Sequence, residues 1–390
     1  MIKILTAYKT EIKPSKKQIN KIKRTIGVSR FIYNFYISEN QRTYKETGSF
    51  TSAFDFSRWL NNEFLPQNED YSWIKEVSSK SVKQSIMNAE AAFKKFFKGK
   101  AGFPNFKKKN SNESKMYFVK NNSSDCLCER HRVKVPTLGW VKLKEKGYIP
   151  TSKDGYTINS GAISYHAGRY YISCLVEKEE ESKPELNSFG LGIDLGLNKF
   201  AIVSNGLIFD NINKSKRIIK LEKKLRREQR RLSRKYEQAK NIEKGGATYK
   251  NIEKQKLKVQ KLYAELTNIR TDYINKIISE LVKTKPTFIT IEDLNISGMM
   301  KNRHLARSIA NQKFYEFRTK LIFKCKQLGI EVRIADRFYP SSKTCHNCGY
   351  VKKDLKLSDR TYKCPECGGI IDRDLNASLN LRDTKSYKVA

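Results

Sequence analysis

The sequence predicts a multidomain protein of the α/β class. Three patterns support this prediction: a helical stretch near the N-terminus, a run of short strands in the middle, and a C-terminal half in which strands and helices follow one another. With 390 residues, of which 38% are hydrophobic, the chain is long enough to form two or three compact domains with cores of their own. Intrinsic disorder is therefore not expected.

The chain is strongly basic. It holds 78 Lys and Arg residues against 40 Asp and Glu residues, which gives a formal net charge of +38. A coding sequence rich in A and T can also enrich Lys, Ile and Asn without any binding role. An excess of this size, however, would repel itself in a compact fold unless a polyanion neutralised it. Nucleic acid or an anionic membrane is therefore the expected partner, and we favour nucleic acid.

No membrane or export signal is visible in the sequence. The start, MIKILTAYKTEIKPSKKQ, lacks an apolar run followed by a small-residue cleavage site, and no window approaches the length of a membrane span. Four of the eight cysteines are scattered, which suits a reducing compartment: Cys126, Cys128, Cys174 and Cys325. We therefore expect a soluble, cytoplasmic protein with no membrane partner.

The N-terminal part predicts a β domain interrupted by helices. The first residues alternate as in a strand, a helical pattern starts at Ser15, and strand-like segments such as VKVPTLGWVKLK follow the helices. We therefore expect a small β-barrel or sandwich from residues 1–12 and 113–185, into which a helical domain of residues 13–112 is inserted. The clearest helix has one apolar face, formed by Val82, Ile86, Ala89, Phe93 and Phe96.

The C-terminal region, residues 186–390, begins with a predicted sheet. The segment LGIDLGLNKFAIVSNGLIFD reads as two strands joined by a glycine turn and a short third strand. The segments TFITIEDL and IEVRIAD predict two more strands, separated by one helix that has Ile309 and Phe317 on its inner face and ends at Gly329. A short helix is expected near the end of the chain.

Residues 213–283, between these strands, predict a basic helical hairpin with a turn at Gly245 and Gly246. Lys214 to Lys235 contains twelve Lys and Arg residues and only two acidic ones. A solvated coiled-coil arm is the alternative, since ion pairs can support such polar helices. The first helix has too few acids to pair its own charges, which favours contacts with phosphates. The candidate contacts are Arg226, Arg227, Arg230 and Arg231.

Four cysteines near the C-terminus form a predicted metal site. The segment CHNCGYVKKDLKLSDRTYKCPEC has the spacing C-x2-C-x15-C-x2-C, and four thiolates so spaced can surround Zn²⁺ tetrahedrally. Four protein ligands leave no position for water or substrate, so we expect a structural zinc ribbon over residues 340–371, with His346 at the surface. The expected ligands are Cys345, Cys348, Cys364 and Cys367.

Acidic residues at three places in the C-terminal region are candidate catalysts. Asp194 lies in a strand between glycines, Glu292 and Asp293 end another strand, and Asp372 and Asp374 begin the last helix. Because neighbouring strand residues point to opposite faces, at most one of Glu292 and Asp293 can share a face with Asp194. Taken singly, each acid is more often a cap or an ion-pair partner. Clustered hard oxygen ligands, however, could hold two Mg²⁺ ions about 4 Å apart for phosphodiester hydrolysis.

Several segments resemble the signature blocks of the TnpB family, which comprises transposon-encoded, RNA-guided nucleases related to the type V CRISPR effectors. In the C-terminal half these segments are GIDLG, FITIEDLNISGMMKN, FYPSSKTCHNCG with CPECG, and IDRDLNAS. Upstream, GVSRFIYNFY, AFKKFFKGKAGFPNFKKK and PTLGWVKL resemble the family's N-terminal blocks. The resemblance therefore covers nearly the whole chain.

The resemblance implies an RNA-guided DNA endonuclease. It implies a RuvC-type, RNase H-like nuclease domain with the zinc ribbon inserted before the last acidic residue, and a wedge-like β-barrel that carries a helical recognition domain. It implies that Asp194, Glu292 and Asp374 are the catalytic carboxylates and hold two Mg²⁺ ions. Asp293 and Asp372 would then be neighbours of the catalytic residues.

The resemblance also implies the partners of the chain. These are a guide RNA and a double-stranded DNA target that carries a short target-adjacent motif. Lys80 and Gln84, one turn apart on the polar face of a helix, are candidates for reading that motif. We expect a monomer bound to RNA in the prokaryotic cytoplasm, at the nucleoid when on DNA. A transposon end is the implied source of the guide, and a CRISPR-like array is the alternative.

Other functions remain open. A nuclease-inactive, RNA-guided repressor would be expected to have lost one of the three carboxylates, and none is lost. A strand-transfer transposase is also RNase H-like, but its last acid is typically a Glu on a helix, whereas the order here is Asp, Glu, Asp. A simple zinc-ribbon DNA-binding regulator of transposition would leave most of the chain unexplained.

Overall fold

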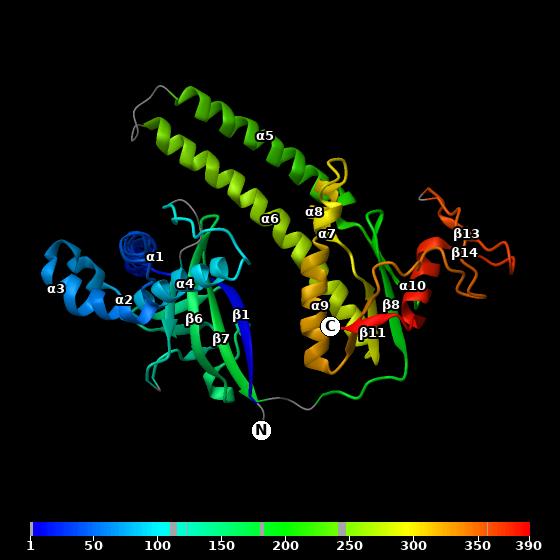
Figure 1. Cartoon of the computed structure of the whole chain (residues 1–390), viewed down its shortest axis with the longest axis horizontal. Helices are drawn as coiled ribbons and strands as arrows, with labels where there is room; N and C mark the ends of the chain where they lie inside the picture. The colour runs from blue at the N-terminus through cyan, green and yellow to red at the C-terminus, as the bar shows by residue number, and fades with distance from the viewer. Residues whose placement is uncertain (1–2, 110–114, 123, 180–182, 241–246, 357) are drawn as a thin grey trace. The chain divides into compact units, whose positions relative to one another are not determined.

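The structure is a computed structural model that describes residues 3–109, 115–122, 124–179, 183–240, 247–356 and 358–390. The chain divides into two compact units, Met1–Glu181 and Ser182–Ala390 (Figure 1). The domain edge expected between residues 112 and 113 lies outside the described residues. Among the helices that the structure describes, none has the length and apolar character needed to cross a membrane.

The first unit contains one seven-stranded antiparallel sheet. Its strands are β1 (Lys3–Lys13), β2 (Met116–Val119), β3 (Cys128–Glu129), β4 (Arg132–Val135), β5 (Gly139–Leu143), β6 (Thr157–His166) and β7 (Arg169–Glu179), in the order β2-β6-β7-β1-β5-β4-β3. Strand β1 pairs with β7 from Lys3 to Ile12, and with β5 at Ile12 and Lys13. The N-terminal strand therefore lies in the middle of a sheet whose other strands follow the helices in the chain.

Side chains from both ends of this sheet share one core. Phe118 of β2 and Val133 of β4 lie in the same buried cluster, together with Cys174 of β7. A sheet whose two ends contribute to one core must curl around it, as in a barrel or a sandwich. Within the described residues, no ladder between the edge strands β2 and β3 closes the sheet.

The helices between β1 and β2 form a separate core that is rich in aromatic residues. They are α1 (Lys16–Thr47), α2 (Ala53–Trp59), the π-helix η1 (Leu60–Phe64), α3 (Leu65–Gln67), the 3-10 helix η2 (Glu69–Glu76) and α4 (Ser79–Phe97). A separate 3-10 turn, η3 (Ser152–Asp154), lies between β5 and β6. Helix α1 begins at the predicted place because Ser15 and Gln18 form a capping box. Four of the five apolar residues predicted for one face of α4 are buried, and the exception is Phe96.

The second unit contains a six-stranded mixed sheet. Its strands are β8 (Gly190–Leu195), β9 (Lys199–Val203), β10 (Ile208–Asp210), β11 (Phe288–Glu292), β12 (Glu331–Ala335) and β15 (Tyr387–Val389), in the order β10-β9-β8-β11-β12-β15. Strands β8, β9 and β10 are antiparallel neighbours, whereas β11 is parallel to both β8 and β12. Strand β15 is antiparallel to β12 at the edge. All of these strands except β15 are predicted by the sequence.

Helices cover both faces of this sheet. Ile193 and Ile291 belong to the main core together with residues of α6 (Ala247–Lys283) and α9 (Phe314–Leu328). Helix α10 (Arg373–Asp383) lies against β8, β9 and β11 on the other face (Figure 1). The side chains of β8 therefore alternate between these two helical layers.

Helices α5 (Lys216–Gln238) and α6 form the basic hairpin, after the short 3-10 turn η4 (Ile212–Lys214). Near the start of α5, Arg217 forms an ion pair with Glu265 of α6 at 3.9 Å. Farther along α5, Glu228 accepts a 2.7 Å hydrogen bond from Gln255 of α6. The partners on α6 move backwards along the chain as α5 advances, so the two helices are antiparallel (Figure 1). The predicted turn at Gly245 and Gly246 lies outside the described residues.

The prediction of one helix through Ile309 and Phe317 is wrong. After α7 (Ile296–Met299), the chain forms α8 (Ala306–Gln312) and α9, and Lys313 breaks the helix with a φ angle of +57°. The buried Gln312 donates a hydrogen bond to the Gly196 carbonyl (3.2 Å), and the Lys313 ammonium donates one to Thr271 (2.9 Å). Contacts with distant segments therefore hold the break, and apolar spacing cannot reveal them.

Candidate active site and zinc-binding cluster

Asp194 and Glu292 lie on neighbouring parallel strands. Residue Ile193 of β8 is in register with Ile291 of β11, and both are buried in the main core. The next residue on each strand, Asp194 and Glu292, must then point to the opposite face of the sheet, side by side. The pairing of the two strands therefore brings together two carboxylates that are about a hundred residues apart in the chain.

Gly192 allows helix α10 to approach the strand that carries Asp194. A Cβ atom at Gly192 would lie 2.0 Å from the carbonyl oxygen of Ser378 and 2.4 Å from the backbone nitrogen of Arg382, both in α10. Only glycine tolerates such close contact with backbone. Because Gly192 and Asp194 are two residues apart on one strand, they share a face. The close contact therefore sets the height of α10 above the side of the sheet where Asp194 lies.

Asp374 completes the candidate site from the first turn of α10. Asp194, Glu292 and Asp374 line one cavity of about 360 Å³. Three cationic side chains, Lys199, Arg360 and Arg373, also line this cavity. The structure therefore brings the three carboxylates implied by the family resemblance to a single place.

The electrostatics of the cavity reflect the crowding of carboxylates. Burial raises the pKa of Asp194 well above its usual value, and the negative charges of Glu292 and Asp374 raise it further, while Arg373 opposes them. Burial also raises the pKa of Glu292, against a hydrogen bond from Ser341 that lowers it. A cation in the cavity would relieve this repulsion.

The neighbouring acids have other partners. Burial alone would raise the pKa of Asp293, but hydrogen bonds from Arg318 (2.9 Å) and Arg337 (2.7 Å) outweigh burial and hold the pKa below its usual value. Asp372 caps α10, because one of its carboxylate oxygens accepts hydrogen bonds from two backbone N–H groups of the first turn, at 3.0 Å each. Neither residue lines the cavity.

The four cysteines form one cluster. Their sulfur atoms all lie within 4.8 Å of one another, with 3.7 Å between Cys345 and Cys367 and 3.6 Å between Cys348 and Cys364. Zinc–sulfur bonds of about 2.3 Å in a tetrahedron place sulfurs about 3.8 Å apart. The cluster could therefore hold Zn²⁺ with little change in geometry.

Both halves of the cluster use the same turn. The Gly349 and Gly368 N–H groups donate hydrogen bonds to the carbonyls of Cys345 and Cys364, and both glycines have positive φ angles. The second turn is flanked by β13 (Thr361–Lys363) and β14 (Ile370–Asp372), which pair with each other, and β14 leads directly into α10. The His346 ring lies 3.7 Å from Asp383, outside the sulfur cluster, as predicted.

The candidate nucleic-acid contacts lie at the surface. Arg226, Arg227, Arg230 and Arg231 are all exposed on α5. Arg231 forms an ion pair with Glu228 at 2.9 Å. Within the described part of the chain, the other three arginines have no ion pair, and two of them line a shallow cavity of about 470 Å³ with Arg234. Their positive charge is therefore available to a partner.

In the first unit, Lys80 is exposed and Gln84 lies on a small cavity of about 260 Å³. Gln84 donates a hydrogen bond to Asn88, which lines the same cavity together with Lys107 and Lys115. The structure therefore places Gln84, but not Lys80, in a polar depression.

Sequence reasoning missed the cationic residues of the acidic cavity and Ser342, which also lines it. Arg373 stands between Asp372 and Asp374 in the sequence, so its position gave a usable signal. Arg360 comes from the ribbon and gave none, because only the fold brings it to the cavity.

Three family models match parts of the chain. A model described as a probable transposase (OrfB_IS605) matches residues 173–303, which include Asp194 and Glu292. A model of the Cas12f1-like TNB domain matches residues 314–381, which include the cysteine cluster and Asp374. A helix-turn-helix domain model (HTH_OrfB_IS605) matches residues 1–49.

Two curated proteins and one solved structure extend these matches. The chain is 29% identical over 397 residues to "Putative RNA-guided DNA endonuclease InsQ" of Escherichia coli (strain K12). This match covers 97% of this chain and 92% of the relative. It is 34% identical over 129 residues to "TnpB-like protein L79" of Acanthamoeba polyphaga mimivirus, which covers 32% of this chain and 24% of the relative. A chain in the cryo-EM structure of a Cas12f1-sgRNA-target DNA complex matches with a TM-score of 0.60 at 16% identity, over 95% of this chain and 83% of the other, which shows a shared fold.

Proposed function

We propose that this chain is an RNA-guided DNA endonuclease, because these matches confirm its resemblance to the TnpB family. It would hydrolyse DNA phosphodiester bonds next to a short target-adjacent motif and would be associated with a transposon. The observation that carries the proposal is the meeting of Asp194, Glu292 and Asp374, from three distant segments, at one cavity. The name of the Escherichia coli relative supports RNA guidance and DNA as the target.

The sheet of the second unit supports an RNase H-like, RuvC-type domain. Three antiparallel strands, β10-β9-β8, are extended by two parallel strands, β11 and β12, and helices cover both faces. The zinc ribbon is inserted between β12 and α10, just before Asp374. In the first unit, the curled sheet corresponds to the proposed wedge-like domain and the helices after β1 to the recognition domain.

The donor set of the cavity fits magnesium. Three carboxylates offer hard oxygen ligands, which Mg²⁺ prefers, and their mutual repulsion favours a divalent cation among them. Two Mg²⁺ ions bound there would supply an activated water and stabilise the leaving oxygen of the phosphodiester. The cysteine cluster, by contrast, has soft ligands in a closed set and fits a structural zinc.

The chain's own residues would hold the carboxylates in place and bind the nucleic acid. Asp194 and Glu292 stand on paired strands and Asp374 at a capped helix start, so their carboxylates are held on rigid elements. Lys199, Arg360 and Arg373 place positive charge at the same cavity, where it attracts the phosphate of a DNA strand. The exposed arginines of α5 would bind the phosphates of the guide RNA or of its hybrid with DNA. Lys80 and Gln84 remain candidates for reading the target-adjacent motif, and we expect one copy of the chain for each RNA.

The test is to express the gene with its flanking noncoding DNA, purify the protein and sequence the RNA that accompanies it. A single RNA species with a constant scaffold and a terminal segment that matches other DNA is expected. Double-stranded DNA with that match and a library of flanking sequences should then be cut in Mg²⁺ by the wild type but not by Asp194→Ala. Absence of any discrete RNA would contradict the proposal and point to an unguided nuclease or a DNA-binding regulator.

Two rival functions have outcomes of their own in this test. If the chain is a nuclease-inactive repressor, it would bind the matched DNA and leave it uncut. The three carboxylates that this chain retains at one cavity argue against that function. A transposase, which the description of one matching family model suggests, would join transposon-end DNA to a second DNA molecule. Strand-transfer products in the same reaction would therefore favour the transposase.

A further inference from the structure

A buried serine outside the catalytic cavity contacts one of its carboxylates. The Ser341 hydroxyl donates a 2.9 Å hydrogen bond to Oε1 of Glu292, and Ser341 is only 4% exposed. Ser341 lies between β12 and the first cysteine turn, and its neighbour Ser342, not Ser341 itself, lines the cavity. The serine therefore contacts Glu292 from the protein side, not from the side open to substrate.

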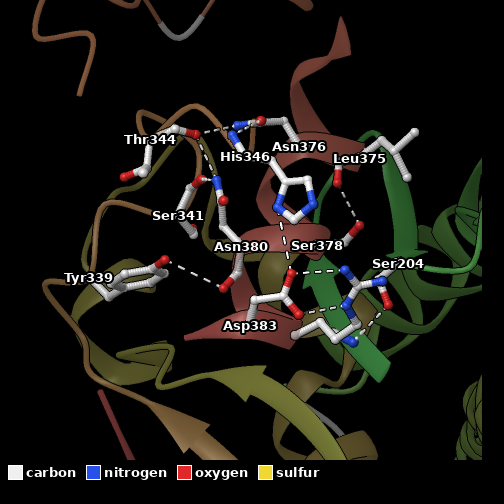
Figure 2. Close-up of polar contacts among 12 residues, drawn as sticks. Ser204, Tyr339, Ser341, Thr344, His346, Leu375, Asn376, Ser378, Asn380 and Asp383 are labelled. Atoms are coloured by element: carbon white, nitrogen blue, oxygen red, sulfur yellow. Dashed lines mark hydrogen bonds and ion pairs between the residues drawn. The ribbon is translucent and has the colours of Figure 1, made fainter. Parts of the chain in front are cut away.

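Helix α10 fixes the backbone of Ser341. The Asn380 side-chain amide donates hydrogen bonds to the carbonyls of Ser341 (2.7 Å) and Thr344 (2.6 Å), and the Asn380 carbonyl accepts one from the Tyr339 hydroxyl (3.4 Å). Figure 2 shows these side chains converging between α10 and the chain that leads into the ribbon. Asn380 is 5% exposed, so replacing it would remove the side-chain donor to the carbonyl of the buried Ser341.

One turn earlier on the same helix, Asn376 makes a matching contact. Its amide donates to the Thr344 carbonyl (2.7 Å) and its oxygen accepts from the His346 N–H (3.0 Å) (Figure 2). Asn376 is fully buried. These two asparagines therefore clamp the segment 341–346 to α10, whose first turn carries Asp374.

We propose that Ser341 is a positioning residue for Glu292, and that Asn380 couples its position to the helix that carries Asp374. A glutamate has three side-chain torsions, and a hydrogen bond to one oxygen restricts which way the other faces. Residues that hydrogen-bond metal-binding carboxylates orient them and tune the metal. One rigid assembly would then set the separation of Glu292 and Asp374. The inference rests on the proposed nuclease function.

A purely structural role makes a different prediction, and Ser378 provides the comparison. Ser378 is also a buried serine, in α10, but its hydroxyl donates to the Leu375 carbonyl one turn earlier (2.7 Å). Such bonds within a helix satisfy a hydroxyl without touching the cavity. Ser341 instead makes a charge-assisted bond to a carboxylate that lines the cavity.

The experiment compares wild type with Ser341→Ala, Ser341→Thr and Ser378→Ala, each purified with its guide RNA and zinc. Three quantities are measured: the melting temperature, the affinity for Mn²⁺ in the absence of DNA by calorimetry, and the cleavage rate as a function of Mg²⁺. For Ser341→Ala we expect weaker Mn²⁺ binding and a higher half-saturating Mg²⁺ concentration, by about 10–100-fold. Ser341→Thr, which keeps the hydroxyl, should recover most of the loss, and Ser378→Ala should behave as wild type.

The inference is overturned if Ser341→Ala binds Mn²⁺ and depends on Mg²⁺ as wild type does. It is also overturned if all three variants lose activity only in proportion to a fall in melting temperature, because that pattern indicates a packing role. A wild-type complex that cuts no matched DNA, while Ser341→Ala still weakens Mn²⁺ binding, would refute the proposed function and leave the positioning of Glu292 standing.

Discussion

The cysteine cluster and the carboxylate cavity are both candidate metal sites, yet they are encoded differently. All four cysteines lie within 23 residues of sequence, in two turns of the same form. The three carboxylates lie in three segments spread from residue 194 to residue 374, and only strand pairing and the contact at Gly192 bring them together. The first site depends on local turns. The second depends on the whole fold of the second unit, so distant changes should affect it.

The largest expected effect tests the carboxylate side of this comparison. Asp194→Ala removes one of the three carboxylates proposed to hold Mg²⁺ but leaves the basic surface of α5 intact. Cleavage of matched DNA should fall by more than the ~10–100-fold typical of residues that only support a ligand, while DNA affinity stays near wild type. Cleavage gels and filter binding measure the two quantities.

Asp372→Asn is the matched control, because Asn also caps a helix and Asp372 does not line the cavity. It should cut at close to the wild-type rate. Persistent cutting by Asp194→Ala would contradict the assignment of the catalytic carboxylates.

The second prediction concerns the cysteine side. Cys345→Ser should lower the zinc content, measured by mass spectrometry of the metal, and should reduce both melting temperature and cleavage. Zinc binding in zinc-finger peptides is worth about 10–16 kcal/mol, so loss of one ligand should unfold the ribbon and displace α10, which follows β14 directly. Cys174→Ala, a change at a buried cysteine outside the cluster, should keep the zinc. A stable, fully active Cys345→Ser protein would refute a structural zinc.

An intermediate effect is expected at Gly192, where the fold itself assembles the cavity. In Gly192→Ala the new methyl group would meet the backbone of α10, so the helix must shift. Overpacking of this kind costs about 1–3 kcal/mol, and cleavage should fall as Asp374 moves with the helix. Gly27→Ala, in α1, adds a methyl group with nothing within 4 Å and should not destabilise the protein. Chemical denaturation and cleavage rates of the two variants decide whether the close contact matters.

The smallest expected effect lies away from both metal sites. Arg226→Ala and Arg230→Ala should each weaken RNA binding and reduce the slope of log K against log salt concentration by about 1, if each arginine neutralises one phosphate. Lys276→Ala is the control, because Lys276 on α6 pairs with Asp272 at 2.7 Å. If the slope of log K against log salt concentration is the same for the Arg226 and Lys276 variants, α5 is not part of the RNA-binding surface.

The sequence predicts those features that depend on local pattern. Cysteine spacing located the cluster, strand alternation separated Glu292 from Asp293, and Ser15 marked the start of α1. Features held by distant partners were missed. The helix break at Lys313 depends on Thr271 and Gly196, and Arg360 reaches the cavity only through the ribbon.

Strand β15 was missed for a similar reason. It has only three residues, Tyr387–Val389, and all three are exposed, so its alternation is too short to mark a strand. Besides its pairing with β12, the strand is contacted by Arg333 of β12, whose guanidinium lies over the rings of Phe288 (3.6 Å) and Tyr387 (4.5 Å). This stacking joins three segments and has no signature in any one of them.

The central position of β1 has a consequence for synthesis of the protein. Strand β1 leaves the ribosome well before its main partner β7, since Lys3 pairs with Glu179. Pairing over such a sequence separation is slow to form, whereas the helices between the two strands can form at once. Until β7 emerges, β1 keeps unpaired backbone groups that other nascent chains could bind. The sheet of the first unit can therefore be completed only after β7 has been translated.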